Sequence, residues 1–112
     1  MLDNRLRPAT QPPRNIYGLL DHMREHPSMW LRRQSLVEIE SILHGYSAAL
    51  KSHRIRESGT EFNRRFSDYL EQRFGWSLCR GWACAIREHS SSSKRAFDRF
   101  FDLLDEFRKT HA

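Results

Sequence analysis

Apolar residues recur at helical spacing along most of this chain, and short polar connections separate the apolar stretches. Asn15, a residue type that favours helix N-caps, precedes an apolar face. That face contains Ile16, Leu19, Leu20 and Met23. The pattern predicts a first helix from Asn15 that ends before Pro27, because a proline disfavours the helical conformation of the residue before it.

The second predicted helix has the clearest start signal in the chain. Ser35 followed by Glu38 has the spacing of a capping box, in which each side chain accepts a hydrogen bond from the other residue's backbone. Its apolar face contains Leu36, Ile39, Leu43, Tyr46 and Leu50. Gly45 inside this helix predicts a close crossing with another helix, since glycine otherwise costs up to about 1 kcal/mol relative to alanine there.

The connection before this second helix, Ser28 to Gln34, holds three large apolar residues. We expect Met29, Trp30 and Leu31 to fill the core between the helices. Residues 54–59 form a predicted polar turn, after which Thr60 is placed to cap a third helix that ends at Gly75.

Two further helices complete the prediction. A short apolar one is expected from Gly81 to His89, and the Ser90–Ser93 run is placed to cap the last one. The apolar face of this last helix contains Ala96, Phe97, Phe100, Phe101, Leu104 and Phe107. No stretch alternates β-branched and polar residues, so the prediction is all-α, a compact bundle of about five helices.

Length and composition divide the chain into two parts. The first 14 residues contain Pro8, Pro12 and Pro13 together with three arginines, so residues 1–14 are predicted to form a flexible Pro/Arg-rich N-terminal arm. Residues 15–112 are predicted to be a single helical domain, because a chain of 112 residues with 12% aromatics can bury a core of its own.

The charge balance is basic, with 19 Lys+Arg against 14 Asp+Glu, and 16 of the cations are arginine. Either a GC-rich bacterial genome or bidentate binding of carboxylates and phosphates can account for the arginines. Nucleic-acid binding is therefore an alternative hypothesis, provided that several basic clusters share one face. The candidate clusters are Arg32-Arg33, Lys51 with His53, Arg54 and Arg56, Arg64-Arg65, and Lys94-Arg95.

One pattern with potential chemistry is His22-Met-Arg-Glu25-His26, which matches the H-x-x-E-H pattern of inverted zinc proteases. A zinc site would need a third, distant ligand, and Pro27 ends the helix directly after His26. We expect two surface histidines near a helix C-terminus, where the helix dipole favours them.

Neither serine nor cysteine spacing indicates catalysis. Ser28 and the Ser90–Ser93 run fit linkers and caps, and Cys79 and Cys84 match no common zinc or redox spacing. We expect both cysteines to be buried beside Trp76 and Trp82. The prediction is a protein without enzymatic activity, metal or cofactor.

No secretory signal and no apolar stretch of membrane-spanning length is visible, and two thiols suit a reducing compartment. A cytoplasmic protein without a membrane partner is expected.

A resemblance to a known family gives a more specific hypothesis. The string His26-Pro27-Ser28-Met29-Trp30-Leu31 is followed by Ser35-Leu36, Gly45-Tyr46, Phe62 to Phe74, Gly81-Trp82, and Ala96-Phe97 to Phe107. In this order it resembles small all-helical bacterial immunity-type proteins encoded in polymorphic toxin and secretion-system loci. The similarity covers about residues 16–107, with Trp30 where the family pattern has Tyr and Arg32 where it has Gly.

The resemblance carries no catalytic residue and implies a non-enzymatic module that binds and neutralises a cognate toxin domain. Two charged sets are candidate contacts with that partner. One is the acidic stripe of the last helix, Asp98, Asp102 and Asp105, and the other is the basic set Arg32, Arg33, Arg64 and Arg65. The alternative for the acidic stripe is ordinary pairing with Arg95, Arg99 and Arg108 or Lys109 on a solvated helix.

Overall fold

The computed structural model describes residues 13–111, and within this range every regular element is helical. The elements are α2 (Ile16–Glu25), α3 (Pro27–Trp30), α4 (Leu36–Ser52), the 3-10 turn η1 (Ser58–Thr60), α5 (Phe62–Phe74), α6 (Trp82–Glu88) and α7 (Ser93–His111). The all-α prediction is confirmed. The one-turn helix α3 is an addition to the five predicted helices. The predicted arm at 1–14 falls outside the described residues, except for the exposed Pro13 and Arg14.

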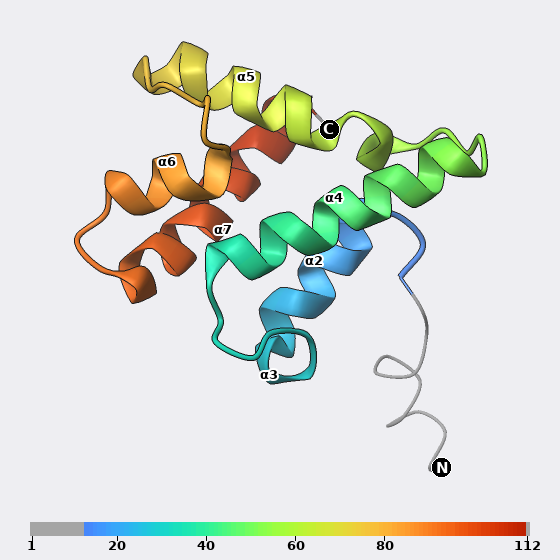
Figure 1. Cartoon of the computed structure of the whole chain (residues 1–112), viewed down its shortest axis with the longest axis horizontal. Coiled ribbons are helices and arrows are strands. Elements are labelled where there is room, and N and C mark those ends of the chain that lie inside the picture. Colours follow the sequence, from blue (N-terminus) through green and yellow to red (C-terminus); the bar gives the residue numbers. More distant parts are fainter. Residues whose placement is uncertain (1–12, 112) are drawn as a thin grey trace.

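Helices α6 and α7 of the second half of the chain pack against the start of α4. Figure 1 shows α4 running through the middle of the view, with α5 above it and α2 and α3 below. The start of α4 lies beside α6 and α7, and its end lies beside η1. The first turn of α4 therefore meets elements that are more than forty residues away in the sequence.

Local capping chemistry places the starts of α2 and α4 where the sequence predicts them. Asn15 Oδ1 accepts a hydrogen bond from Gly18 N at 2.9 Å and caps α2. The capping box of α4 is complete, because Ser35 Oγ accepts from Glu38 N at 3.4 Å and the Glu38 carboxylate accepts from Ser35 N at 3.2 Å. These local bonds fix the start of α4, which borders the candidate site.

The centre of the core is aromatic. Phe66 is fully buried, and its ring lies 5.5 Å from Trp82, 5.6 Å from Phe100 and 5.5 Å from Phe107 (centroid to centroid), each edge to face. Trp82 stacks on Phe100 at 4.7 Å, and its indole N–H donates to Asn63 Oδ1 at 2.9 Å. One aromatic cluster thus joins α5, α6 and α7 and satisfies the buried indole donor.

The expected core plug of Met29, Trp30 and Leu31 is wrong for two of its three residues. Leu31 is buried, but Met29 is 64% exposed and Trp30 is 36% exposed. Pro27 explains the difference: proline fits the first position of a helix, so residues 27–30 form α3 rather than an irregular connection. A helical turn spreads consecutive side chains around its axis, and only Leu31 points into the core.

The expected close crossing at Gly45 is also wrong. Gly45 is exposed, and a Cβ added there would meet no atom within 4 Å. Close approaches occur at other glycines, such as Gly59 in η1, where an added Cβ would lie 2.7 Å from the Tyr46 ring. The predicted cap at Thr60 is wrong as well: Thr60 closes η1 by accepting from Glu57 N, and α5 starts after Glu61.

Candidate functional site

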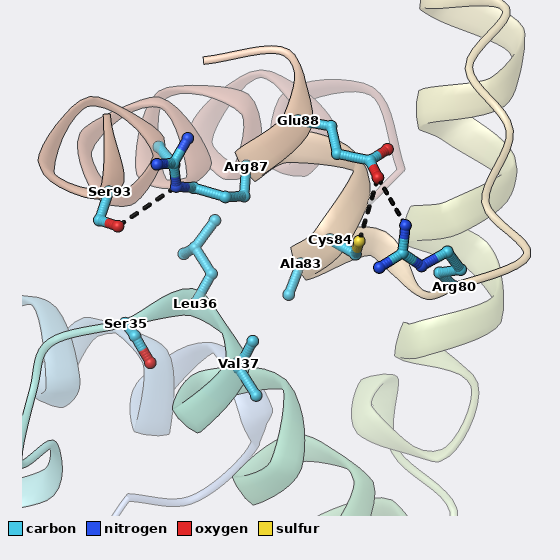
Figure 2. A pocket seen from close by; sticks show the side chains of 10 residues that line it. Ser35, Leu36, Val37, Arg80, Ala83, Cys84, Arg87, Glu88 and Ser93 are labelled. Carbon is cyan, nitrogen blue, oxygen red and sulfur yellow. Dashed lines mark hydrogen bonds and ion pairs between the residues drawn. The ribbon is translucent and has the colours of Figure 1, made fainter. Parts of the chain in front are cut away.

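A groove of about 360 Å³ lies where the first turn of α4 faces α6 and the start of α7. We call it the α4–α6–α7 groove, and Figure 2 shows its side chains. It is lined by Ser35, Leu36, Val37, Arg80, Ala83, Cys84, Arg87, Glu88, Ser93 and Ala96. Leu36, Ala83 and Ala96 are buried and form an apolar floor, whereas Val37 is 61% exposed. An aliphatic side chain is therefore presented to solvent at the edge of an apolar depression.

Charged side chains surround this floor. Arg80 Nη1 pairs with Glu88 Oε2 at 2.9 Å on the α6 side of the groove, and both side chains are more than half exposed. Arg87 donates from Nε to Ser93 Oγ at 3.2 Å and from Nη1 to Ser90 O at 3.3 Å, which ties α6 to the start of α7. The groove thus has fixed walls and a polar rim.

The two cysteines differ from their predicted burial. Cys79 is exposed, and Cys84 is half-buried in the groove with its thiol 3.6 Å from Glu88 Oε2. Desolvation raises the pKa of the Cys84 thiol, although the positive charge of Arg80 acts in the opposite direction. A raised pKa disfavours the thiolate, which is the nucleophilic form. The surroundings of Cys84 therefore do not activate it.

A glycine allows α6 to approach α4 closely at the groove. Gly81 adopts φ +93°, and a Cβ there would lie 2.5 Å from Glu40 Oε2. The same carboxylate oxygen accepts weakly from Ala83 N at 3.4 Å. Glu40 therefore faces the first turn of α6 and helps to hold it against α4.

A second depression adjoins the groove at Ser93, which lines both. It is lined by Arg32, Arg33, Gln34, Ser93, Lys94 and Phe97. We call its three cations, Arg32, Arg33 and Lys94, the basic shoulder. Glu38 fixes the loop that carries two of them, because its carboxylate accepts from Arg32 N and Arg33 N at 2.9 Å each. The capping residue of α4 therefore also positions the basic shoulder.

This role of Glu38 predicts a specific pH dependence of stability. Backbone hydrogen bonds from Arg33, Ser35 and Arg32 hold the pKa of Glu38 below its ordinary 4.5, against a smaller effect of desolvation. Because the folded-state pKa is the lower one, the unfolded chain binds the proton first as pH falls, and the stabilisation is lost below about pH 4.5.

Glu38→Gln is therefore expected to be less stable than the wild type at about pH 7, and the difference should shrink at about pH 3. Urea denaturation of both proteins at the two pH values measures it. A difference that stays constant with pH would show that the charge of Glu38 does not hold the loop.

The predicted acidic stripe lies along α7 but is engaged with several neighbours. Asp98 pairs with Lys94 at 3.1 Å, and Asp105 pairs with Arg24 of α2 at 2.9 Å. Asp102 is exposed beside Arg99 in a shallow polar depression. Asp98 and Asp105 thus pair with residues other than the expected Arg95, Arg99 and Arg108 or Lys109, and Arg108 instead pairs with Asp21 at 2.8 Å.

The predicted basic set is divided between two surfaces. Arg32 and Arg33 lie at the basic shoulder, whereas Arg64 lies on α5 and pairs with Glu61 at 3.1 Å and Asp68 at 3.3 Å. Arg65, also on α5, lies near Tyr17, where its charge opposes the rise in the pKa of Tyr17 that burial causes. Only the first two candidates therefore border the groove.

The H-x-x-E-H segment has a structural contact. His22 Nδ1 accepts a hydrogen bond from the Trp30 indole N–H at 2.8 Å, so this nitrogen is engaged by α3. His22 and His26 lie with ring centroids 4.9 Å apart. Among residues 13–111, no three His, Cys, Asp or Glu side chains are arranged to hold a metal ion.

In the same part of the chain, none of the helices is both long enough and apolar enough to cross a membrane.

Sequence reasoning missed the groove itself. Its one available signal was Val37, an aliphatic residue that lies off the apolar face of Leu36, Ile39 and Leu43. Arg80 and Arg87 reach the groove from elements that sequence patterns could not place beside α4. Comparison of the chain with protein-family models, curated proteins and solved structures gives no match.

Proposed function

We propose that this chain is a non-enzymatic protein-binding module: an immunity protein that binds a cognate bacterial toxin domain in the cytoplasm and neutralises it. The observation that carries the proposal is the α4–α6–α7 groove, an apolar floor within a charged rim. Family resemblance in the sequence supports the same conclusion.

The groove has the composition that protein interfaces use at their centres. Interfaces combine an apolar, desolvated centre with a polar rim, and arginine is enriched at their most important positions. Here Leu36, Ala83 and Ala96 supply the apolar centre, and Arg80 and Arg87 lie on the rim. Neutralisation requires tight association and no turnover, and a surface of this composition is compatible with that function.

Co-expression tests this proposal. The chain is produced together with the toxin domain encoded beside it, and cell survival and complex formation by affinity purification are measured. The proposal predicts survival and a stable complex, whereas an unrelated helical protein of similar charge should give neither. Absence of both protection and a complex would refute the immunity function.

A nucleic-acid-associated regulatory module is the second candidate, and the basic shoulder favours it. Arg32, Arg33 and Lys94 line one depression, so three cations could contact successive phosphates. Neutralising three phosphates of duplex DNA gives a slope of about −2.7 for log K against log salt concentration. Retention on DNA or RNA with such a slope, lost in Arg32→Glu/Arg33→Glu, would support this candidate over the first.

A further inference from the structure

We infer that the groove and the basic shoulder together bind an acidic protein segment of the toxin domain, which inserts an apolar side chain beside Val37. This inference rests on the proposed function and adds the contact surface and the chemistry of the partner. Both depressions meet at Ser93, so one continuous segment can cover them.

The apolar part of the surface fits a side chain of the partner. Val37 is 61% exposed at the edge of a depression whose floor is formed by the buried Leu36, Ala83 and Ala96. Figure 2 shows Leu36 projecting from the start of α4 into the groove, with Val37 beside it and Ala83 of α6 on the opposite side. A volume of about 360 Å³ is at the lower end of small-ligand pockets, which hold roughly 300–1,000 Å³. A groove of this volume suits one inserted side chain better than a larger ligand.

The charges around the surface specify an acidic partner. Among the residues lining the two depressions, Arg32, Arg33, Arg80, Arg87 and Lys94 are cations and Glu88 is the one carboxylate. Five positive charges and one negative charge leave a formal +4. Carboxylates on the partner would complement this surface and accelerate association.

Nearby carboxylates face other groups. Glu38 accepts from the backbone N–H groups of Arg32 and Arg33, and Glu40 faces Ala83 N. Asp98 pairs with Lys94 and lines a different depression. These groups lower the net field, and Arg80 and Arg87 also bond to Glu88, Ser93 and Ser90. The four arginines of the rim and shoulder are nevertheless exposed.

An apolar floor favours a protein over a nucleic acid as the occupant. Single-stranded nucleic acids gain affinity by stacking bases on aromatic side chains. Across the lining of both depressions the one aromatic residue is Phe97, which is buried. The floor therefore offers burial to an aliphatic or aromatic side chain and no stacking platform to a base.

The first test uses Val37→Asp, with the dissociation constant of the complex with the co-encoded toxin domain as readout. Aspartate in the first turn of α4 suits the helix dipole, so the fold should be kept. We expect the dissociation constant to rise by at least about tenfold, a change that corresponds to the loss of one buried apolar contact.

Ile55→Asp is the matched control, because Ile55 is a similarly exposed aliphatic residue, 51% exposed, beyond the other end of α4. Its dissociation constant should stay within about twofold of the wild-type value. If the wild type forms a complex and Val37→Asp leaves its dissociation constant unchanged, this inference is overturned and the proposed function stands. Failure of the wild type to form any complex would overturn both.

The second test addresses the charge of the partner. The double variant Arg32→Glu/Arg33→Glu should bind the toxin domain more weakly, and its binding should depend less on salt. The control is Arg54→Glu/Arg56→Glu, which reverses two exposed arginines outside the surface and should bind as the wild type does. Titrations at about 50 and 500 mM NaCl measure this. Wild-type affinity that is independent of salt, or equal effects of the two charge reversals, would overturn the inference that the bound segment is acidic. Binding of duplex or single-stranded DNA through the same residues, without the toxin domain, would also overturn it.

Discussion

Replacing Phe66 by alanine is expected to lower the free energy of unfolding by about 3–5 kcal/mol, the usual cost of removing a buried aromatic side chain. Phe66 is fully buried at the point where α5, α6 and α7 meet. Its ring contacts Trp82, Phe100 and Phe107, so its removal opens a cavity between three helices. Few other substitutions remove so many contacts at once.

The measurement is urea denaturation followed by tryptophan fluorescence, because Trp82 lies against Phe66. Domains of this kind have total stabilities of about 5–15 kcal/mol, so the variant should lose a large part of its stability. Ile55→Ala is the control at an exposed position and should change stability by no more than about 0.5 kcal/mol. A loss below about 1 kcal/mol for Phe66→Ala would contradict the aromatic core described above.

A second large effect is expected at Leu31, with its neighbour Met29 as an internal comparison. Leu31→Ala should lower the free energy of unfolding by about 2–5 kcal/mol, because Leu31 is 3% exposed and belongs to the core. Met29→Ala should change it by about 0.5 kcal/mol or less, because Met29 is 64% exposed.

Thermal or urea denaturation of both variants measures this contrast. Equal losses for Leu31→Ala and Met29→Ala would instead support the sequence prediction that Met29, Trp30 and Leu31 all fill the core. A large loss at Leu31 alone would establish that α3 separates the two side chains, as its single helical turn does in the structure.

Helix positions could be predicted because their determinants are local. Asn15 bonds to Gly18, and Ser35 bonds to Glu38, so each cap depends on residues three positions apart. Gly75 ends α5 in the left-handed conformation, φ 73°, which glycine adopts without strain. Such signals are complete within a few residues of sequence.

Packing partners could not be predicted in the same way. A glycine in a helix suggested a crossing at Gly45, yet close approaches occur at Gly59, where η1 meets Tyr46, and at Gly81, where α6 begins against α4. Asp105 was expected to pair within its own helix, yet it pairs with Arg24 of α2. Each of these contacts depends on how distant elements are oriented.

The residues of the candidate site could likewise be predicted only where a local sequence pattern marks them. Sequence patterns singled out Arg32 and Arg33 by their charge, and both border the groove. Val37, Arg80 and Arg87 were missed, because only the packing of α6 and α7 against the start of α4 brings them together. The predicted contacts on α5, Arg64 and Arg65, lie on another surface and carry no part of the proposed interface.

The central claim is that this chain neutralises a toxin domain through the α4–α6–α7 groove. Survival of cells that express the co-encoded toxin domain together with wild type, Val37→Asp or Ile55→Asp tests it most directly. The proposal predicts protection by the wild type and Ile55→Asp and reduced protection with Val37→Asp, at equal levels of folded protein. Full protection by Val37→Asp, or none by the wild type, would contradict the claim.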